Sequence, residues 1–187
     1  MCQLFGGINP CARCGNVITS YSVGGTMPEI LKDATMVVGL GSPIMSDDAV
    51  GLKIAERVGD LGISDIETRQ EAIGGLDILP VIRGFRFAVI VDSILTGGVP
   101  PGTVMIFDPE HFEHTVVPAS AHDVNLATAI AIGRQMEPDM MPETVKYVAV
   151  EACDIQTVSE SMTPDVEAAI PSAVNAVLHL ISEFRKG

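Results

Sequence analysis

The sequence has few basic residues and no apolar run long enough to cross a membrane. It contains 11 lysines and arginines against 24 aspartates and glutamates, for a formal net charge of −13 at pH 7. This sign disfavours binding to a nucleic-acid backbone or an anionic membrane. No stretch reaches the roughly 18 uninterrupted apolar residues of a membrane span, and the N-terminus lacks the basic flank and apolar core of a signal peptide. We therefore expect a cytoplasmic protein with neither nucleic acid nor membrane as its partner.

The sequence also lacks low-complexity tracts and room for a second full domain. Its 187 residues, 47% hydrophobic and 19% charged, are typical of one globular domain. Residues 1–34 contain two Gly-Gly pairs and no apolar periodicity. We expect a single domain over residues 35–187, preceded by a cysteine-containing N-terminal extension over residues 1–34.

Short apolar runs alternate with helical patterns along this domain. Thr35–Leu40 and Arg86–Asp92 are typical of buried parallel strands, and apolar residues recur at helical spacing from position 47 onward. Ser46, Asp47 and Asp48 would supply the cap and the first-turn negative charge of that helix. Further strands are expected at residues 63–71, 103–107 and 145–150, and further helices at residues 75–82, 123–136 and 165–184. This order predicts an α/β three-layer sandwich, with a mostly parallel central sheet of about five strands and helices on both faces.

Three side chains able to bind a metal follow predicted strands or precede a later helix. Asp48 comes after the first strand, Asp92 ends the strand at 86–92, and His122 precedes the helix at 123–136. Taken singly, each has an ordinary interpretation, as a helix N-terminal acid, a cap of the turn after a strand, and a structural histidine. Because the carboxyl ends of parallel strands share one sheet edge, all three could meet there. Two carboxylates and an imidazole suit Ni²⁺, Zn²⁺ or Fe²⁺ and leave open positions for a substrate group or water.

The glycines that follow the first strand invite a nucleotide-binding interpretation. Gly39-Leu-Gly41 would begin the dinucleotide fingerprint, but the third glycine should stand at position 44, which is isoleucine. No acidic residue follows at the end of a well-defined second strand. The sequence therefore disfavours a nucleotide-dependent oxidoreductase and favours a tight turn that leaves Asp47 and Asp48 at the mouth of the sheet.

Five motifs lie in order between about Thr35 and Ile181. They are Gly39-Leu-Gly-Ser-Pro-Ile-Met-Ser-Asp-Asp-Ala-Val-Gly51, Gly74-Gly-Leu-Asp-Ile-Leu79, Val89-Ile-Val-Asp92, Pro101-Gly-Thr103 and Ser120-Ala-His122. Together they resemble, in order and spacing, the motifs of the hydrogenase maturation endopeptidases. That family removes a C-terminal peptide from the large subunit of nickel–iron hydrogenase after nickel insertion and recognises the substrate's nickel. The resemblance implies an endopeptidase whose partner is a hydrogenase large-subunit precursor.

The resemblance also implies roles for particular residues. Asp48, Asp92 and His122 would be the metal ligands, Asp48 and Asp92 the catalytic carboxylates, and Asp47 a structural neighbour. Nickel would arrive with the substrate, and zinc or cadmium could replace it in vitro. Ser42-Pro43 stands where the family commonly has asparagine after the second glycine, which could alter substrate choice. A non-catalytic nickel-recognition or hydrogenase-assembly factor with the same binding residues is the alternative function.

Three of the four cysteines, Cys2, Cys11 and Cys14, lie in the extension, outside the resemblance. A Cys-x-x-Cys spacing is typical of metal-binding or redox-active sites. Three interpretations stay open. The cysteines could form a small metal clip with a fourth ligand from elsewhere, or belong to a disordered extension. They could also mimic substrate, since Asn9-Pro-Cys-Ala-Arg-Cys14 resembles the Asp-Pro-Cys-x-x-Cys nickel-ligand segment of hydrogenase large subunits.

Overall fold

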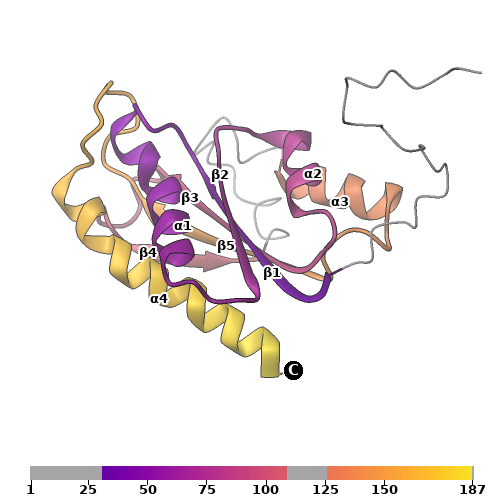
Figure 1. Cartoon of the computed structure of the whole chain (residues 1–187). Helices are drawn as coiled ribbons and strands as arrows, with labels where there is room; N and C mark the ends of the chain where they lie inside the picture. Colours follow the sequence, from indigo (N-terminus) through magenta and orange to yellow (C-terminus); the bar gives the residue numbers. More distant parts are fainter. Residues whose placement is uncertain (1–30, 109–125, 187) are drawn as a thin grey trace, which may run out of the picture.

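The computed structural model describes residues 31–108 and 126–186, and these residues form a five-stranded sheet with helices (Figure 1). The strands are β1 (Leu31–Leu40), β2 (Ile66–Glu71), β3 (Phe85–Ile94), β4 (Val104–Phe107) and β5 (Thr144–Glu151). The helices are α1 (Val50–Asp60), α2 (Leu79–Ile82), α3 (Leu126–Met136) and α4 (Pro164–Lys186), with short 3-10 helices η1 (Ser46–Ala49) and η2 (Gly75–Ile78) before α1 and α2. The strand order is β2-β1-β3-β5-β4, and only the edge pair β4–β5 is antiparallel.

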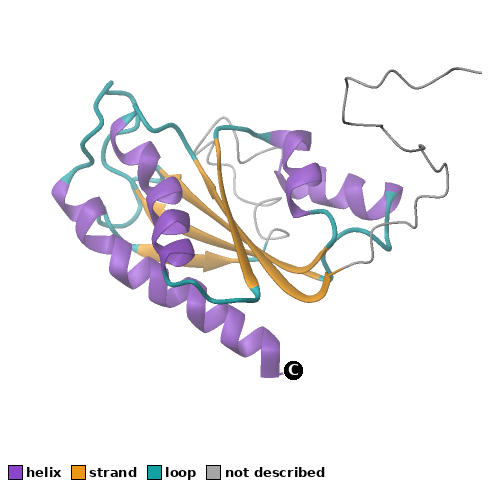
Figure 2. Cartoon of the chain, viewed as in Figure 1, coloured by secondary structure: helices purple, strands orange, loops and turns teal. Residues whose placement is uncertain are grey.

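Helices cover both faces of this sheet, as Figure 2 shows. On one face, α1 and α4 bury Ile54, Val58 and Val177 against Val37 and Val89 of the central strands. On the other face, α2 and α3 pack their apolar side chains against β1, β3 and β5. Strands that are covered on both sides need apolar residues at nearly every position, which is why the central residues of β1 and β3, 36–40 and 87–91, form apolar runs. The predicted α/β three-layer sandwich with a mostly parallel sheet is therefore confirmed. Within the described ranges, no helix is long and apolar enough to cross a membrane.

Two predicted helices differ from the structure because each is divided in two. In the first, residues 46–49 form the separate 3-10 helix η1, and the N–H of Ser46 donates to the carbonyl oxygen of Ser159 at 2.9 Å. In the second, Pro80 stands in the first turn of α2, where its missing N–H is tolerated because no helical partner is needed there. The pattern of apolar residues predicted helical structure at both places but not these breaks.

Three boundaries also differ. β2 begins at Ile66 rather than at 63, because the preceding residues form a turn closed by a hydrogen bond from the Ile66 N–H to the Ile63 carbonyl oxygen. β1 begins at Leu31, four residues before the predicted strand. The start of the helix predicted over 123–136 lies partly outside the described residues, as does most of the extension at 1–34, so the domain boundary stays a prediction.

The ends of β1 and β3 contact the start of α1 backbone to backbone. A Cβ atom added at Gly39 would come closer than 3.0 Å to the carbonyl oxygen of Gly51. A Cβ added at Gly51 would approach the carbonyl oxygens of Leu40 and Val91 just as closely. Only glycine permits such an approach. The first turn of α1 therefore lies directly against the carboxyl edge of the sheet, which places Asp48 at that edge.

Candidate active site

Asp48 lies half-buried in η1, just beyond the end of β1. Its Oδ2 accepts a hydrogen bond from the Ser42 N–H at 2.8 Å, and its Oδ1 accepts one from the Ser93 hydroxyl at 2.9 Å. The prediction that Ser46, Asp47 and Asp48 cap this helix is wrong. The N-cap residue is Met45, and no side chain makes the capping hydrogen bond, although Asp47 and Asp48 do lie in the first turn. The side chain of Asp48 instead connects to the sheet.

Asp92 is buried in β3, with 2% of its surface exposed. Its Oδ1 accepts a hydrogen bond from the Ser93 N–H at 2.8 Å, and its Oδ2 accepts one from the Tyr147 hydroxyl at 3.2 Å. The strand continues to Ile94, so Asp92 lies inside β3 rather than at its end as predicted. The reason is that residues 92–94 keep pairing with β5.

Asp48 and Asp92 meet the carboxyl edge of the sheet from opposite faces. Successive side chains of a strand point to opposite faces. Asp92 faces the cluster that contains Tyr147 and is covered by α2 and α3, whereas Ser93 faces Asp48 on the α1 side. Ser93 therefore links the two predicted carboxylates, through its hydroxyl to Asp48 and through its N–H to Asp92. Their shared role as metal ligands stays a prediction.

The third predicted ligand, His122, lies outside the described residues. Among residues 31–108 and 126–186, no three His, Cys, Asp or Glu side chains gather in a group that could hold a metal ion. The predicted set of Asp48, Asp92 and His122 is therefore untested as a whole. Cys2, Cys11 and Cys14 also lie outside the described ranges, and the metal clip predicted for them stays a prediction.

Asp47 has the structural role that was predicted for it. Its side chain is fully buried, and its carboxylate accepts four hydrogen bonds from the loop between β5 and α4. The donors are the N–H groups of Cys153 at 2.9 Å, Asp154 at 2.9 Å and Thr163 at 2.7 Å, and the Thr163 hydroxyl at 2.9 Å. Each donor satisfies part of the buried charge, so this carboxylate holds the loop rather than a ligand. Asp47 thereby fixes the segment that carries Asp48.

The loop after β1 is also joined to the loop after β5 by backbone hydrogen bonds. Met45 and Ser159 form an isolated parallel bridge. Ser46 directly follows Met45 in the sequence. Its φ of 47° makes it, among the described residues, the one non-glycine with positive φ. Such a conformation costs about 1–3 kcal/mol and needs the surrounding structure to hold it. The apolar side chains of Ile44 and Val158, next to the bridged residues in sequence, are 52% and 74% exposed.

The loop after β5 contains one carboxyl group with a shifted pKa. Hydrogen bonds from the Thr157 hydroxyl, and then from the amides of Gln156 and Thr157, lower the pKa of Asp154 below its ordinary value of 3.8. The charged Asp154 therefore stabilises the turn that follows it. This turn lies next to the amides that bind Asp47, so it belongs to the same rigid loop.

The sequence reasoning missed two polar residues near the site. Glu151 is 1% exposed at the end of β5, and its carboxylate accepts hydrogen bonds from the Thr96 N–H at 2.9 Å, the Thr96 hydroxyl at 2.8 Å and the Gly97 N–H at 2.7 Å. Glu151 thus fixes the loop that follows β3. Asp92 was selected because it is a carboxylate at the end of an apolar strand. Glu151 has the same position at the end of β5, and the predicted strand at 145–150 stopped one residue short of it. Ser93, which follows Asp92 directly, offered no such signal.

Two grooves lined by described residues lie elsewhere on the molecule. One, of about 230 Å³, is formed by α2, α3 and their neighbours, and the other, of about 450 Å³, lies between α1 and α4. Neither is lined by Asp48 or Asp92. The chemistry-bearing groups therefore lie at the sheet edge and not in these apolar grooves.

The fold is that of an α/β protein with acidic side chains near the carboxyl edge of a mostly parallel sheet. The family model described as hydrogenase maturation protease matches residues 73–180, which is more than half of the chain. The chain therefore belongs to the hydrogenase maturation protease family, which confirms the resemblance seen in the motifs. The match spans Asp92 and His122 and begins after Asp48.

Individual relatives agree with this family. The chain is 27% identical over 156 residues to the hydrogenase 2 maturation protease of Escherichia coli strain K12, covering 79% of this chain and 90% of the relative. The hydrogenase maturating endopeptidase HybD from Escherichia coli is structurally similar, with a TM-score of 0.68, 25% identity, and coverage of 80% of this chain and 93% of that one. The [NiFe] hydrogenase maturation protease HybD from Thermococcus kodakarensis shares the fold, with a TM-score of 0.65, 22% identity, and coverage of 79% and 99%.

Proposed function

We propose that this protein is an endopeptidase that removes the C-terminal peptide of a nickel-loaded [NiFe]-hydrogenase large-subunit precursor in the cytoplasm. In this proposal Asp48, Asp92 and His122 bind the nickel that the substrate carries. Membership of the hydrogenase maturation protease family supports the reaction. The observation that supports the site is the hydrogen bond from Ser93 to Asp48, which ties the first carboxylate to the strand that carries the second.

The carboxylate of Asp48 has the capacity to take a metal ion. It accepts two hydrogen bonds from described residues, one on each oxygen. An ionised carboxylate offers about four acceptor sites, so Asp48 can bind an ion without losing the contacts that hold it. Its half-buried position also leaves one side open to a substrate. These features suit a ligand that meets an incoming metal rather than one closed inside the protein.

The chemistry that such a site would supply is metal-assisted hydrolysis. The substrate's nickel, held between the carboxylates and His122, would polarise the scissile carbonyl and lower the pKa of a bound water. A carboxylate released from the ion would accept the proton of that water. The burial of Asp92 and its hydrogen bonds from Ser93 and Tyr147 keep it fixed in place. Asp48, nearer to solvent, has more freedom to exchange a proton.

The dependence on substrate nickel can be tested with two forms of one precursor. The full-length protein is incubated with a nickel-loaded large-subunit precursor and, separately, with the same precursor prepared without nickel, and the masses are followed by mass spectrometry. We expect loss of the C-terminal peptide from the nickel-loaded form alone. Equal cleavage of both forms would show that nickel is not the recognition feature, and cleavage of neither would contradict the endopeptidase itself.

A non-catalytic nickel-recognition or assembly factor is the second candidate. The observation in its favour is that Asp92 is buried and both of its oxygens already accept hydrogen bonds, which holds the side chain in place and disfavours proton exchange with water. Calorimetric titration of the isolated protein with Ni²⁺ separates the two functions. Tight binding of nickel without cleavage of any precursor favours the assembly factor, whereas cleavage with weak resting affinity favours the endopeptidase.

A further inference from the structure

Ser93 contacts both predicted site carboxylates with different parts of one residue. Its hydroxyl donates to Asp48 Oδ1 at 2.9 Å, and its N–H donates to Asp92 Oδ1 at 2.8 Å. The residue is 1% exposed, so water cannot readily replace either hydrogen bond. Neither the motifs nor the family match assigns a role to it.

Ser93 lies within the sheet, whereas Asp48 lies outside it. Ser93 pairs with Val150 in the parallel ladder between β3 and β5, and the loop that follows is held by the buried Glu151. Asp48 lies on a four-residue 3-10 helix outside the sheet. Its other hydrogen bond comes from Ser42, in the loop after β1. The strand therefore provides the fixed reference against which the more exposed carboxylate is oriented.

The hydrogen bond from Ser93 to Asp48 is of the strong kind. A hydroxyl that donates to an ionised carboxylate makes a charge-assisted hydrogen bond, roughly twice as strong as a neutral one. Without it, Oδ1 of Asp48 loses its donor and the side chain regains freedom about its torsions. Small displacements matter at a reacting centre, since a misplacement of about 1 Å can cost roughly a hundredfold in rate.

We propose that Ser93 is a positioning residue that fixes the Asp48 carboxylate relative to Asp92, so that both face the substrate's metal at a set separation. The effect on catalysis rests on the proposed function, whereas the orientation of Asp48 rests on the geometry alone. Ser93 touches neither substrate nor metal in this proposal. It acts through the two carboxylates that do.

A packing role for Ser93 would have different consequences. If the serine served only to fill the space between β3 and η1, replacing it by alanine would lower stability and leave Asp48 in place. Thr35 is a suitable control because it is also 1% exposed and polar but lies in the middle of β1, away from the end that leads to Asp48. Thr35→Val removes a buried hydroxyl of the same class far from Asp48.

The test uses the full chain carrying Ser93→Ala, Ser93→Thr or Thr35→Val, with two readouts. The first is the crystal structure of each variant, which reports the conformation of the Asp48 side chain. The second is kcat/KM for the nickel-loaded precursor. We expect Ser93→Ala to release Asp48 from its present conformation and to lower kcat/KM about tenfold or more, the loss expected for one hydrogen bond to a charged group. Ser93→Thr keeps the hydroxyl and should stay within about threefold of the wild type, as should Thr35→Val.

Each result decides between the two claims. If Asp48 keeps its conformation in Ser93→Ala, or if kcat/KM is unchanged while the wild type is active, the positioning role is overturned. If the wild type cleaves no precursor, the proposed function fails. The conformation of Asp48 then decides the positioning role by itself. A Ser93→Ala variant that loses activity no more than Thr35→Val would also reject it.

Discussion

Asp47 and Thr163 stand 116 positions apart and are joined by two hydrogen bonds, from the Thr163 N–H to Oδ1 at 2.7 Å and from its hydroxyl to Oδ2 at 2.9 Å. Thr163 immediately precedes α4. The acid at the start of η1 therefore fastens the entry to the last helix, while its neighbour Asp48 turns toward Ser93. The two adjacent carboxylates differ because hydrogen-bond donors enclose Asp47, whereas Asp48 is half-buried and accepts two hydrogen bonds.

Replacing Asp47 by asparagine should destabilise the protein. Oδ1 accepts from the N–H of Thr163, and Oδ2 accepts from the N–H groups of Cys153 and Asp154. An amide has one acceptor oxygen. In Asp47→Asn the new NH₂ group must therefore face at least one backbone N–H, and two hydrogen-bond donors would then point at each other. We expect a loss of about 2 kcal/mol or more in the free energy of unfolding, measured by denaturant titration. The exposed Asp60→Asn is the control and should change stability by less than about 0.5 kcal/mol.

Replacing Glu151 by glutamine should be tolerated, in contrast to Asp47→Asn. Oε1 of Glu151 accepts both backbone N–H groups, and Oε2 accepts only the Thr96 hydroxyl. A glutamine can keep its oxygen on the two amides, and its NH₂ can donate to the hydroxyl, which rotates to accept. We expect a loss under about 1 kcal/mol for Glu151→Gln and about 2 kcal/mol or more for Glu151→Ala. Amide hydrogen exchange at Thr96 and Gly97 checks the reason, because protection should fall in the alanine variant alone.

Adding a methyl group at Gly39 should separate α1 from the sheet edge. The new Cβ would meet the backbone carbonyl of Gly51 at less than 3.0 Å, and backbone atoms cannot move aside as a flexible side chain can. Gly39→Ala should therefore cost about 1–3 kcal/mol by overpacking, with a loss of peptidase activity as Asp48 shifts. Gly98→Ala is a matched control, since its Cβ would make only an ordinary contact of 3.5 Å with Thr96. A Gly39→Ala variant as stable and active as Gly98→Ala would show that the close contact is unimportant.

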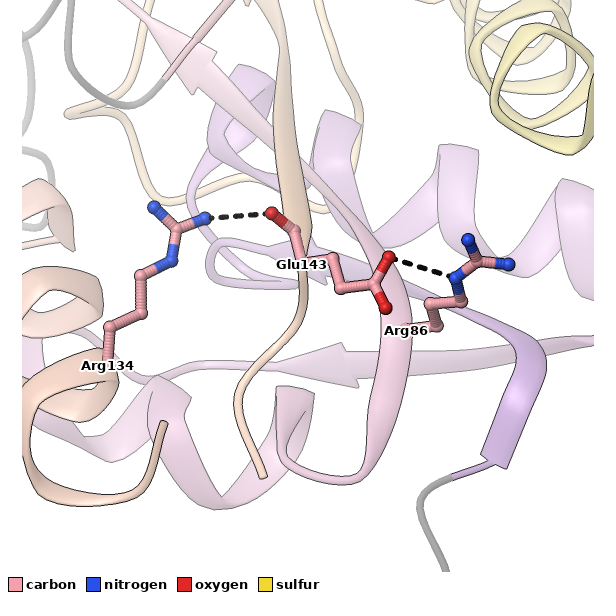
Figure 3. Close-up of polar contacts among 3 residues, drawn as sticks. All are labelled: Arg86, Arg134 and Glu143. Atoms are coloured by element: carbon pink, nitrogen blue, oxygen red, sulfur yellow. Dashed lines mark hydrogen bonds and ion pairs between the residues drawn. The ribbon is translucent and has the colours of Figure 1, made fainter. Parts of the chain in front are cut away.

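Polar contacts at the opposite end of β3 and β5 should have little effect on activity (Figure 3). Arg86 Nε lies 2.9 Å from Glu143 Oε2, and these side chains are 43% and 65% exposed. Arg134 binds the backbone carbonyl of Glu143 at 3.4 Å, a contact that survives a change of side chain. Exposed ion pairs contribute about 0–1 kcal/mol. Glu143→Gln should shift the unfolding midpoint slightly and leave precursor cleavage unchanged, and a marked loss of cleavage would mean that the site extends beyond the carboxyl edge.

The sequence was sufficient to predict the sheet because its central strands are covered on both faces. The central residues of β1 and β3, 36–40 and 87–91, are apolar and buried, as is typical of strands that helices cover on both faces. The pairing of β4 could not be predicted in the same way. Three of its four residues are partly buried, Ile106 is exposed, and the strand runs antiparallel at the edge, so its composition does not reveal its direction.

The candidate site was predictable to the level of which carboxylates lie near one edge, and no further. The motif resemblance assigned a ligand role to Asp48 and a structural role to Asp47. The structure agrees for Asp47, which is fully buried and surrounded by hydrogen-bond donors. Apart from the nearby Ser42 N–H, the donors come from Thr163, Cys153, Asp154 and Ser93, all distant in sequence from the acids of η1. No local pattern encodes such partners. The role of Ser93 in particular depends on strand alternation, which turns two consecutive residues of β3 toward opposite faces of the sheet.

The most direct test of the account is the rate at which site variants cleave a nickel-loaded large-subunit precursor. Asp48→Ala, Asp92→Ala and His122→Ala are compared with wild type and with Asp60→Ala, which removes an exposed carboxylate at the end of α1. We expect each of the three site variants to lose about a hundredfold or more in kcat/KM, because each would remove a ligand that positions the metal and the scissile bond, while Asp60→Ala cleaves normally. Normal cleavage by all three site variants would contradict the assignment of this site.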